Sequence, residues 1–262
     1  MKTQILALGL LMAVAACEEK NNNQNNNATQ EVVEDKGYDV LMTLGHDTGS
    51  FTQGLVFHEN TLLESTGGNG TSWISAIDYT TGIGERKADL DDRYFGEGIT
   101  VMDGKIYQLT WHGKTGFIYD ASTYEKLDKF RYDFEGWGIT HDGNSLIISD
   151  GSENLRFMDP TSFSLLKEIK VTENGRKVSY LNELEYIKGF IFANQWQTDD
   201  ILKIDPATGN VVKRYNFSQL AADNKQMNPQ ADVLNGIAYN ATNDQVYITG
   251  KLWPRAYIIR LR

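Results

Sequence analysis

The residue with the clearest potential for chemistry is Glu97, a carboxylate between two glycines in the segment Phe-Gly-Glu-Gly-Ile-Thr at 95–100. Glycines let a backbone turn sharply and approach other groups closely. A short motif of this kind, taken alone, is more often a turn at a strand edge than a site. The segment recurs in altered form along the whole chain, however, and this recurrence favours a functional interpretation of Glu97.

The recurring segment opens a pair of β-like runs five times, with successive separations of 44, 40, 45 and 53 residues. The residues at the position of the carboxylate are Gln53, Glu97, Trp137, Asn182 and Asn235. A purely structural ring usually carries small or apolar side chains, whereas this one carries amides, one carboxylate and one indole. Only one of the five repeats therefore has a carboxylate at this position.

Further candidate residues stand at the ends of the second runs: Trp111, Trp196 and Lys251, the last beside Trp253. Together the two sets predict a pocket with an aromatic wall and a few convergent polar groups, as is typical of small-ligand sites. Each member also has a structural alternative. The asparagines are common turn residues, the tryptophans serve for packing, and Lys251 could be a solvated loop charge.

Other chemistries fit the sequence less well. The four histidines lack the spacing of a catalytic zinc site: His46, His58, His112 and His141. Ser65 and Ser152 do not lie in a G-x-S-x-G motif, and no P-loop or dinucleotide fingerprint is present. The net charge of −10 argues against a nucleic-acid partner, because a phosphate backbone requires a basic face.

The elements that must position these residues are short strands joined by turns. Each repeat contains a first hairpin and then a second hairpin with alternating faces, and four strands in about 45 residues indicate a propeller blade. The fifth repeat lacks its fourth strand, while the segment 38–44 at the other end has no blade of its own. The sequence thus predicts an all-β, five-bladed β-propeller over 37–262, its last blade closed by the N-terminal strand. An open β-sandwich is the alternative, and it does not explain the constant spacing.

The first 36 residues are not predicted to belong to the propeller. Residues 1–16 have a basic start, a short apolar run and small residues before Cys17, as in a lipoprotein-type signal peptide. Cys17 is the single cysteine, so it forms no internal disulfide and is predicted to be lipidated. Residues 17–36 then form an Asn-rich tether. The predicted location is extracytoplasmic, on a membrane whose identity and face stay open; an ordinary secretory signal is the alternative.

Long stretches of the propeller region resemble a known family. The matching segments are Phe-Thr-Gln-Gly-Leu at 51–55, Phe-Gly-Glu-Gly at 95–98, Tyr-Gln-Leu-Thr-Trp at 107–111, Gly-Trp-Gly at 136–138, Leu-Asn-Glu-Leu-Glu-Tyr at 181–186, Asn-Gln-Trp-Gln at 194–197 and Thr-Gly-Lys-Leu-Trp-Pro at 249–254. They are similar to the glutamine cyclotransferases of the zinc-independent, five-bladed propeller type. The resemblance spans essentially all of 38–262.

The resemblance implies an enzyme that converts N-terminal glutamine into pyroglutamate with loss of ammonia. It implies that Glu97 is catalytic and that the following residues line the active site: Gln53, Trp111, Trp137, Asn182, Trp196 and Lys251. We hypothesise that Glu97 moves a proton from the substrate amine to the leaving nitrogen. Lys251 and Asn182 are candidate oxyanion donors, and a tryptophan indole N–H is a further candidate.

The expected partners are peptides or proteins that begin with glutamine, and the protein is expected to be a monomer. No cofactor and no catalytic metal are expected, while a structural cation in the central channel stays open. The alternative function is a non-catalytic surface propeller that binds peptides or acts as a scaffold. A propeller lactonase is a third hypothesis, but such enzymes need metal ligands at the axis, and the predicted ring supplies few.

Overall fold

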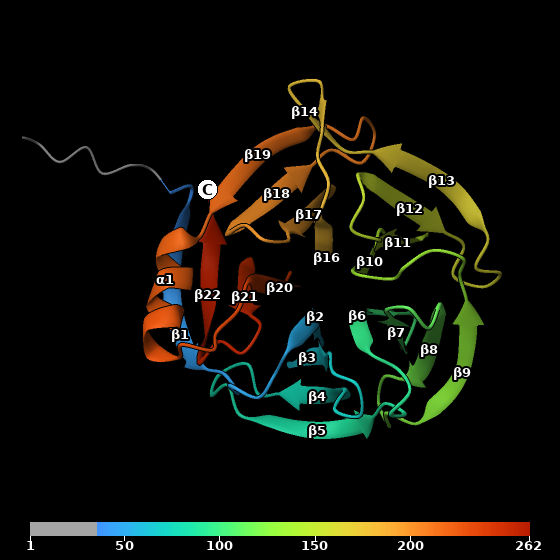
Figure 1. The fold of residues 1–262 in the computed structure, drawn as a ribbon, viewed down its shortest axis with the longest axis horizontal. Coiled ribbons are helices and arrows are strands. Elements are labelled where there is room, and N and C mark those ends of the chain that lie inside the picture. The colour runs from blue at the N-terminus through green and yellow to red at the C-terminus, as the bar shows by residue number, and fades with distance from the viewer. Residues whose placement is uncertain (1–35) are drawn as a thin grey trace, which may run out of the picture. The chain divides into compact units, whose positions relative to one another are not determined.

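The computed structural model describes residues 36–262, whose strands form five four-stranded antiparallel sheets around a central axis (Figure 1). These sheets are the blades of a β-propeller, so the predicted five-bladed fold is confirmed. The predicted signal peptide, Cys17 and all of the predicted tether before Lys36 lie outside the described residues. Nothing in the structure therefore tests the predicted lipid anchor.

In blades 1 to 4 the strands follow the chain order, from the innermost strand outward. Blade 1 consists of β2 (Thr52–His58), β3 (Thr61–Thr66), β4 (Trp73–Ile77) and β5 (Gly84–Asp89). Blade 2 consists of β6 (Gly96–Met102), β7 (Lys105–Thr110), β8 (Thr115–Asp120) and β9 (Lys126–Arg131). Blade 3 consists of β10 (Ile139–His141), β11 (Leu146–Ser149), β12 (Asn154–Met158) and β13 (Leu165–Lys170). Blade 4 consists of β16 (Leu181–Ile187), β17 (Phe190–Gln195), β18 (Asp200–Ile204) and β19 (Val211–Asn216).

Blade 5 joins the two ends of the propeller. It consists of β20 (Leu234–Asn240), β21 (Gln245–Gly250), β22 (Arg255–Leu261) and, as its outermost strand, β1 (Tyr38–Gly45). Strand β1 runs antiparallel to β22, with Tyr38 opposite Leu261 and Gly45 opposite Arg255. The N-terminal strand thus closes the last blade, as the incomplete fifth repeat predicted. Ring closure leaves no blade without neighbours and shields most sheet edges.

The recurring glycine allows the innermost strands to pack closely. A Cβ atom on Gly54 would lie 2.5 Å from the backbone nitrogen of Ile99 in the next blade. A Cβ atom on Gly138 would lie 2.0 Å from the carbonyl oxygen of Asn182. No ordinary side chain fits at such distances, so these positions require glycine. Gly98, beside the candidate carboxylate, is one of this set: its amide donates to the Trp137 carbonyl at 2.7 Å.

Blade 4 departs from this pattern, because Glu183 replaces the glycine. Its carboxylate accepts hydrogen bonds from the amides of Ile237 in blade 5 at 2.8 Å and Leu55 in blade 1 at 3.3 Å. Burial and the nearby charge of Glu185 hold the pKa of Glu183 well above its usual value. One side chain therefore links three blades at the axis. The expectation of a single carboxylate holds for the aligned ring position but not for the innermost strands as a whole.

In residues 36–262 the hydrophobic core consists of five clusters, each between two adjacent blades. The cluster between blades 1 and 2, for example, contains Val56 and Leu63 from one blade and Ile99 and Phe117 from the other. Successive residues of a strand point to opposite faces of its sheet, and inner strands such as β6 and β11 are buried along their whole length. Both faces of a blade are therefore apolar, and each is covered by a neighbouring blade. Burial of this kind is the main stabilising term of the ring.

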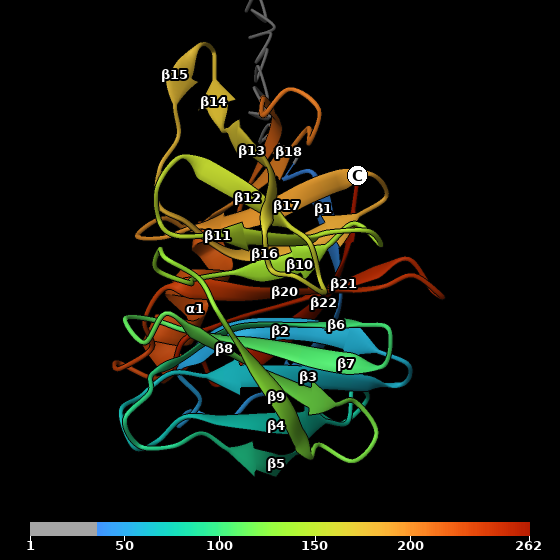
Figure 2. The same cartoon turned by 90° about the vertical axis from the view of Figure 1, so that its right-hand side faces the viewer.

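In the part of the chain that the structure describes, one helix and one two-stranded hairpin lie outside the blades, and neither was predicted. Helix α1 (Ser218–Met227) precedes blade 5 and contacts it through Asn224, whose Nδ2 donates to the Tyr257 hydroxyl at 2.9 Å. The short hairpin of β14 (Thr172–Glu173) and β15 (Arg176–Lys177) projects from the rim of the ring (Figures 1 and 2). Within residues 36–262, no helix is long and apolar enough to cross a membrane.

Candidate active site

The candidate site is a cavity of about 330 Å³ where the innermost strands begin and the second strands end. Its lining residues are Phe51, Gln53, Phe95, Glu97, Trp111, Trp137, Asn182, Trp196, Asp232 and Lys251. All seven residues proposed from the sequence for catalysis or substrate binding are among them. The repeat brings them together because equivalent positions of different blades meet around one axis. Their roles in the reaction stay predictions.

Glu97 is held in the cavity wall without a partner. Only 4% of it is exposed, and within residues 36–262 its carboxyl group makes no hydrogen bond. Burial raises the pKa of Glu97 well above its usual value; Lys251 opposes this shift and Glu135 adds to it. A buried carboxyl group that borders a cavity and has a raised pKa is suited to exchange protons with a ligand in that cavity.

Lys251 supplies a buried cation close to this carboxyl group. It follows directly after β21, and 4% of it is exposed. Burial lowers the pKa of Lys251, while the charges of Glu97 and Asp232 act to raise it. Its ammonium nitrogen lies 4.7 Å from the centre of the Phe51 ring, a cation–π distance. Among the described residues the ammonium group of Lys251 donates no hydrogen bond, so its three N–H donors are available to a ligand.

Asn182 presents an unsatisfied acceptor. Its Oδ1 atom is buried and has no hydrogen-bond partner among the described residues. Buried polar atoms nearly always find a partner, and an orphan acceptor costs about 1–3 kcal/mol. Because Asn182 lines the cavity, a bound ligand with an N–H group can satisfy this atom. The structure thus favours an acceptor role for Asn182 Oδ1, in addition to the predicted donor role of its amide nitrogen.

The aromatic wall is formed by rings packed edge to face. The Trp137 and Trp196 rings lie 5.6 Å apart at 88°, and the Phe95 and Trp111 rings lie 5.7 Å apart at 63°. Gly151 lies against Trp137, since a Cβ atom there would lie 2.7 Å from the indole ring. Such aromatic pairs stabilise the fold by more than the burial of their surface alone, and they hold the rings in defined orientations. The wall can therefore confine a flexible aliphatic side chain.

One predicted role changes with the structure. The indole N–H groups of Trp111 and Trp137 both donate to Glu135 Oε2, at 3.0 and 3.1 Å. Neither is therefore available as the indole oxyanion donor that the sequence left open. The indole N–H of Trp196 makes no hydrogen bond within residues 36–262 and is the remaining indole donor.

Two residues of the predicted set lie outside the cavity wall. Asn235 is fully buried and donates to the Thr52 carbonyl at 3.0 Å and to Gln53 Oε1 at 3.4 Å. It therefore supports Gln53 from behind. Trp253 belongs to the core between blades 4 and 5, where its indole donates to the Asp232 carbonyl at 2.8 Å. For both residues the structural alternative is correct.

Three lining residues were missed from the sequence. Phe51 and Phe95 each stand two positions before the aligned polar residue, as Phe-Thr-Gln-Gly and Phe-Gly-Glu-Gly. This repeated spacing was the signal that could have found them. Asp232 precedes β20 in a segment without a counterpart in the other repeats, and its amide donates to the Lys251 carbonyl at 2.8 Å. No sequence pattern marked it.

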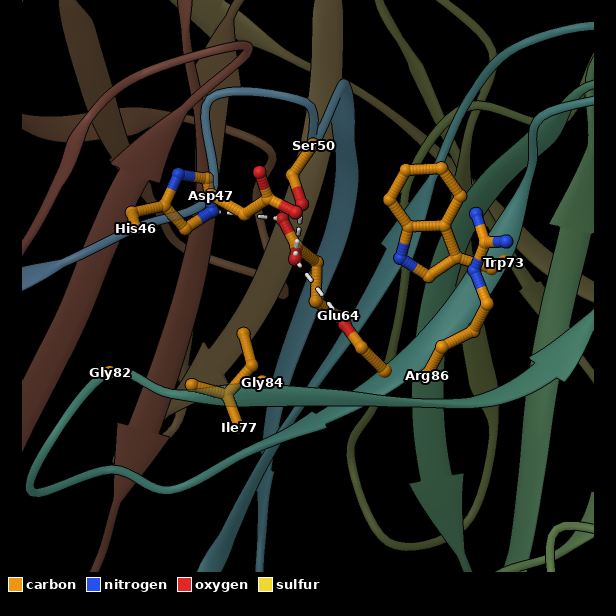
Figure 3. Close-up of a pocket in the computed structure, with 10 residues that line it drawn as sticks. His46, Asp47, Ser50, Glu64, Trp73, Ile77, Gly82, Gly84 and Arg86 are labelled. Atoms are coloured by element: carbon orange, nitrogen blue, oxygen red, sulfur yellow. Dashed lines mark hydrogen bonds and ion pairs between the residues drawn. The ribbon is translucent and has the colours of Figure 1, made fainter.

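A second polar cavity lies elsewhere in blade 1 and contains Glu64 (Figure 3). Glu64 accepts from the hydroxyl of Thr52 at 2.6 Å and of Ser50 at 3.0 Å, and pairs with His46 Nε2 at 3.0 Å. The Glu64 carboxylate is thus fully engaged, in contrast to Glu97. This difference favours Glu97 over Glu64 as the carboxyl group that can act on a ligand. Within the described part of the chain, no group of three or more His, Cys, Asp or Glu residues could hold a metal ion.

Comparisons with known proteins identify the family. The sequence profile of the family described as glutamine cyclotransferase matches residues 9–261. A glutaminyl-peptide cyclotransferase from Arabidopsis thaliana is 40% identical over 227 residues, which are 86% of this chain and 71% of the plant protein. The crystal structure of Myxococcus xanthus glutaminyl cyclase is 35% identical with a TM-score of 0.77, over 86% of this chain and 96% of that one.

A solved structure with much lower sequence identity shares the fold. A protein of unknown function from Bacteroides thetaiotaomicron has a TM-score of 0.53 at 11% identity, over 85% of this chain and 76% of that one. That likeness concerns the fold alone. The family profile and the 40% identical plant protein, in contrast, each cover most of the chain. The chain therefore belongs to the glutamine cyclotransferase family.

Proposed function

We propose that the cavity around Glu97 is the active site in which this enzyme, a glutaminyl-peptide cyclotransferase, closes the N-terminal glutamine of a peptide into pyroglutamate. The substrate α-amine attacks the γ-carboxamide carbon and forms the new C–N bond. The original carboxamide C–N bond then breaks, and its nitrogen leaves as ammonia after gaining the proton that the amine lost. The observation that carries the proposal is a buried carboxyl group without a partner, beside a buried ammonium and an unsatisfied amide.

The first task of the site is to fold the glutamine side chain back onto its own amine. The reaction is intramolecular, so holding the chain in a near-attack shape supplies much of the acceleration. The cavity of about 330 Å³ is enclosed by aromatic rings, including Trp111, Trp137 and Trp196. These rings exclude water from the bound side chain and restrict its rotation. In our mechanism the unsatisfied Asn182 Oδ1 accepts an N–H of the substrate and so orients it.

The second task is proton transfer, which we assign to Glu97. The α-amine of a peptide has a pKa of about 8, so raising the pKa of a carboxyl group makes it a stronger base toward that amine. Burial raises the pKa of Glu97 in this way. In our mechanism Glu97 takes a proton from the attacking amine and delivers it to the departing nitrogen. The group starts and ends the cycle in the same protonation state.

The third task is to stabilise the oxyanion of the tetrahedral intermediate. Lys251 is the candidate with a full charge, and its ammonium donors are unused by the protein. A buried cation stabilises a developing anion far more than an exposed one does, because little water screens it. Gln53 is held by Asn235 and offers its amide as a further polar contact. These residues supply every group that the mechanism requires, so we propose that no cofactor takes part.

The test is ammonia release from a glutamine-initiated dipeptide by the full-length protein. A dipeptide whose amine is blocked is the substrate control, because it has no nucleophile. Glu97→Gln should stay folded and lose about 10²- to 10⁴-fold in kcat, the usual contribution of a general acid–base group. Turnover of the variant close to that of the wild type would contradict the assignment of Glu97. No release by the wild type from any glutamine peptide would favour a peptide-binding function instead.

We also propose that the enzyme acts outside the cytoplasm, as a monomer anchored through a lipid on Cys17. The support is the sequence alone: the leader before Cys17 and the Asn-rich segment after it. Cys17→Ala should move the enzyme from the membrane fraction to the soluble fraction of expressing cells. An unchanged distribution would contradict the anchor.

A further inference from the structure

A carboxylate outside the cavity lining connects two tryptophans of the wall. Glu135 lies in the loop between β9 and β10, and its side chain is 40% exposed. One oxygen, Oε2, accepts the indole N–H groups of Trp111 at 3.0 Å and Trp137 at 3.1 Å. The other oxygen, Oε1, lies 3.3 Å from His112 Nδ1. Neither the sequence motifs nor the proposed mechanism assigns this residue a role.

The bridge joins parts of the wall that come from different blades. Trp111 follows β7 in blade 2, whereas Trp137 precedes β10 in blade 3. An indole can rotate about its bond to the backbone, and a fixed partner for its N–H selects one orientation. Hydrogen bonds to a charged acceptor are stronger than those between neutral groups. Glu135 thus fixes the relative placement of two rings that neither blade alone determines.

The rest of the surroundings supports the same arrangement. The His112 ring stacks on Trp111 with centroids 3.8 Å apart and planes at 25°. Phe95 contacts Trp111 through the T-shaped pair of the wall. Trp111 is therefore held from several directions, and the Glu135 carboxylate connects this cluster to Trp137.

We propose that Glu135 is a positioning residue whose carboxylate clamps Trp111 and Trp137 and so sets the shape of the cage for the glutamine side chain. The inference depends on the proposed function, since the cage is defined by that substrate. It goes beyond the proposed function by assigning a role to a residue that does not line the cavity. Its consequence is that removal of the carboxylate loosens two walls at once without removing either ring.

The charge of Glu135 gives the clamp a second, separable effect. The charged and titratable groups that act with Glu97 are Lys251, which lowers its pKa, and Glu135, which raises it. The charge of Glu97 also acts to raise the pKa of Tyr132, and the charge of Asp232 acts to raise the pKa of Lys251. Removing the negative charge of Glu135 therefore lowers the pKa of Glu97. The limb of the pH–rate profile that titrates Glu97 should then move to lower pH.

The test compares Glu135→Gln and Glu135→Leu in the full-length protein, with kcat and KM measured across pH. Leucine removes the acceptors, and a wall displaced by about 1 Å can cost roughly 100-fold in rate. We expect Glu135→Leu to lower kcat/KM by about 10- to 100-fold with an increase in KM. Glutamine keeps one acceptor oxygen and should restore most of this loss, while both variants shift the limb that titrates Glu97 to lower pH.

Glu168→Gln is the matched control, because Glu168 is a partly exposed, ion-paired carboxylate on the outer strand β13. It should leave kcat, KM and the pH profile unchanged. A Glu135→Leu enzyme that matches this control would overturn the inference. So would equal losses in the leucine and glutamine variants, because the acceptor oxygen would then be irrelevant. If the leucine variant does not fold, Glu135→Ala, which also removes both acceptor oxygens, takes its place in the comparison with Glu135→Gln. A wild type without turnover contradicts the proposed function itself, whereas a normal wild type with unaffected variants contradicts only the clamp.

Discussion

The buried pair of His46 and Glu64 predicts a large and specific loss of stability when its carboxylate is removed (Figure 3). The two side chains are 3% and 2% exposed, and the Nε2–Oε1 distance is 3.0 Å. His46 Nδ1 also bonds the Trp253 carbonyl at 2.7 Å, and Ser50 and Thr52 donate to Glu64. The network thus connects blade 1 to the turn after Lys251.

The expected loss of folding stability in Glu64→Gln follows from the buried groups that lose their charged partner. Breaking a buried pair by removing one charge typically costs about 3–5 kcal/mol. We expect the lower part of this range, about 3 kcal/mol, because an unpaired His46 can release its proton near neutral pH. The amide oxygen also keeps a hydroxyl partner. For a domain of this size, such a loss lowers Tm by about 6–12 °C.

The assay is thermal and urea-induced unfolding at pH 6, with Glu85→Gln as the control. Glu85 pairs with Lys87 in the same blade, but its side chain is 76% exposed. Exposed pairs contribute about 0–1 kcal/mol, so the control should be nearly neutral. In the double variant His46→Gln with Glu64→Gln, the loss should be smaller than the sum of the single losses, because no unpaired charge remains.

The pH dependence provides an independent check on the same pair. Burial works to lower the pKa of His46, but the charge and hydrogen bond of Glu64 raise it above its usual value. The stabilising contribution of His46 is therefore complete below its unfolded pKa of about 6.5 and is lost as pH rises through the folded pKa. Burial works to raise the pKa of Glu64, but His46 and the hydroxyl donors lower it. Its contribution is present above about pH 4.3 and is lost as pH falls through the folded pKa.

Two results would refute this reasoning. One is a Glu64→Gln protein as stable as the Glu85→Gln control, since the buried network would then contribute nothing. The other is a stability difference between wild type and His46→Gln that does not shrink as the pH rises above neutrality. The kinetics must also separate the two buried carboxylates: Glu64→Gln should lose far less kcat than the roughly 100-fold or more expected for Glu97→Gln.

Two further predictions concern the cavity wall. Lys251→Met removes the cation that lowers the pKa of Glu97, so the limb of the pH–rate profile that titrates Glu97 should move to higher pH, opposite to the Glu135 variants. We also expect kcat to fall by about 10²- to 10³-fold. A limb that does not move would contradict the electrostatic coupling between Lys251 and Glu97. Gly67→Ala places a Cβ atom 2.2 Å from the Phe95 ring and should cost about 1–3 kcal/mol of stability and raise KM. Gly45→Ala, with no atom within 4 Å of its Cβ, is the control in the same unfolding and kinetic assays; equal effects of the two substitutions would exclude the clash as the cause.

Much of the fold could be predicted from the sequence because its determinants are local and repeated. Alternating apolar residues and short turns define each strand, and five copies at similar spacing define five blades. The segment 38–44 had no blade of its own and the fifth repeat lacked a fourth strand, so the two could be assigned to each other. The same repeat brought Gln53, Glu97, Trp137 and Asn182 into one ring before any contact was known.

The tertiary structure decided which members of that ring face the cavity and which groups hold them. Asn235 occupies an equivalent repeat position but turns to Thr52 and Gln53, and Glu183 takes the place of a glycine. The clamp at Glu135 likewise joins indoles from two blades. These outcomes depend on contacts between residues far apart in the chain. Periodicity specifies where a residue stands in its own blade. The packing of one blade against another selects which polar groups find partners and which, like the carboxyl group of Glu97, make no hydrogen bond within residues 36–262.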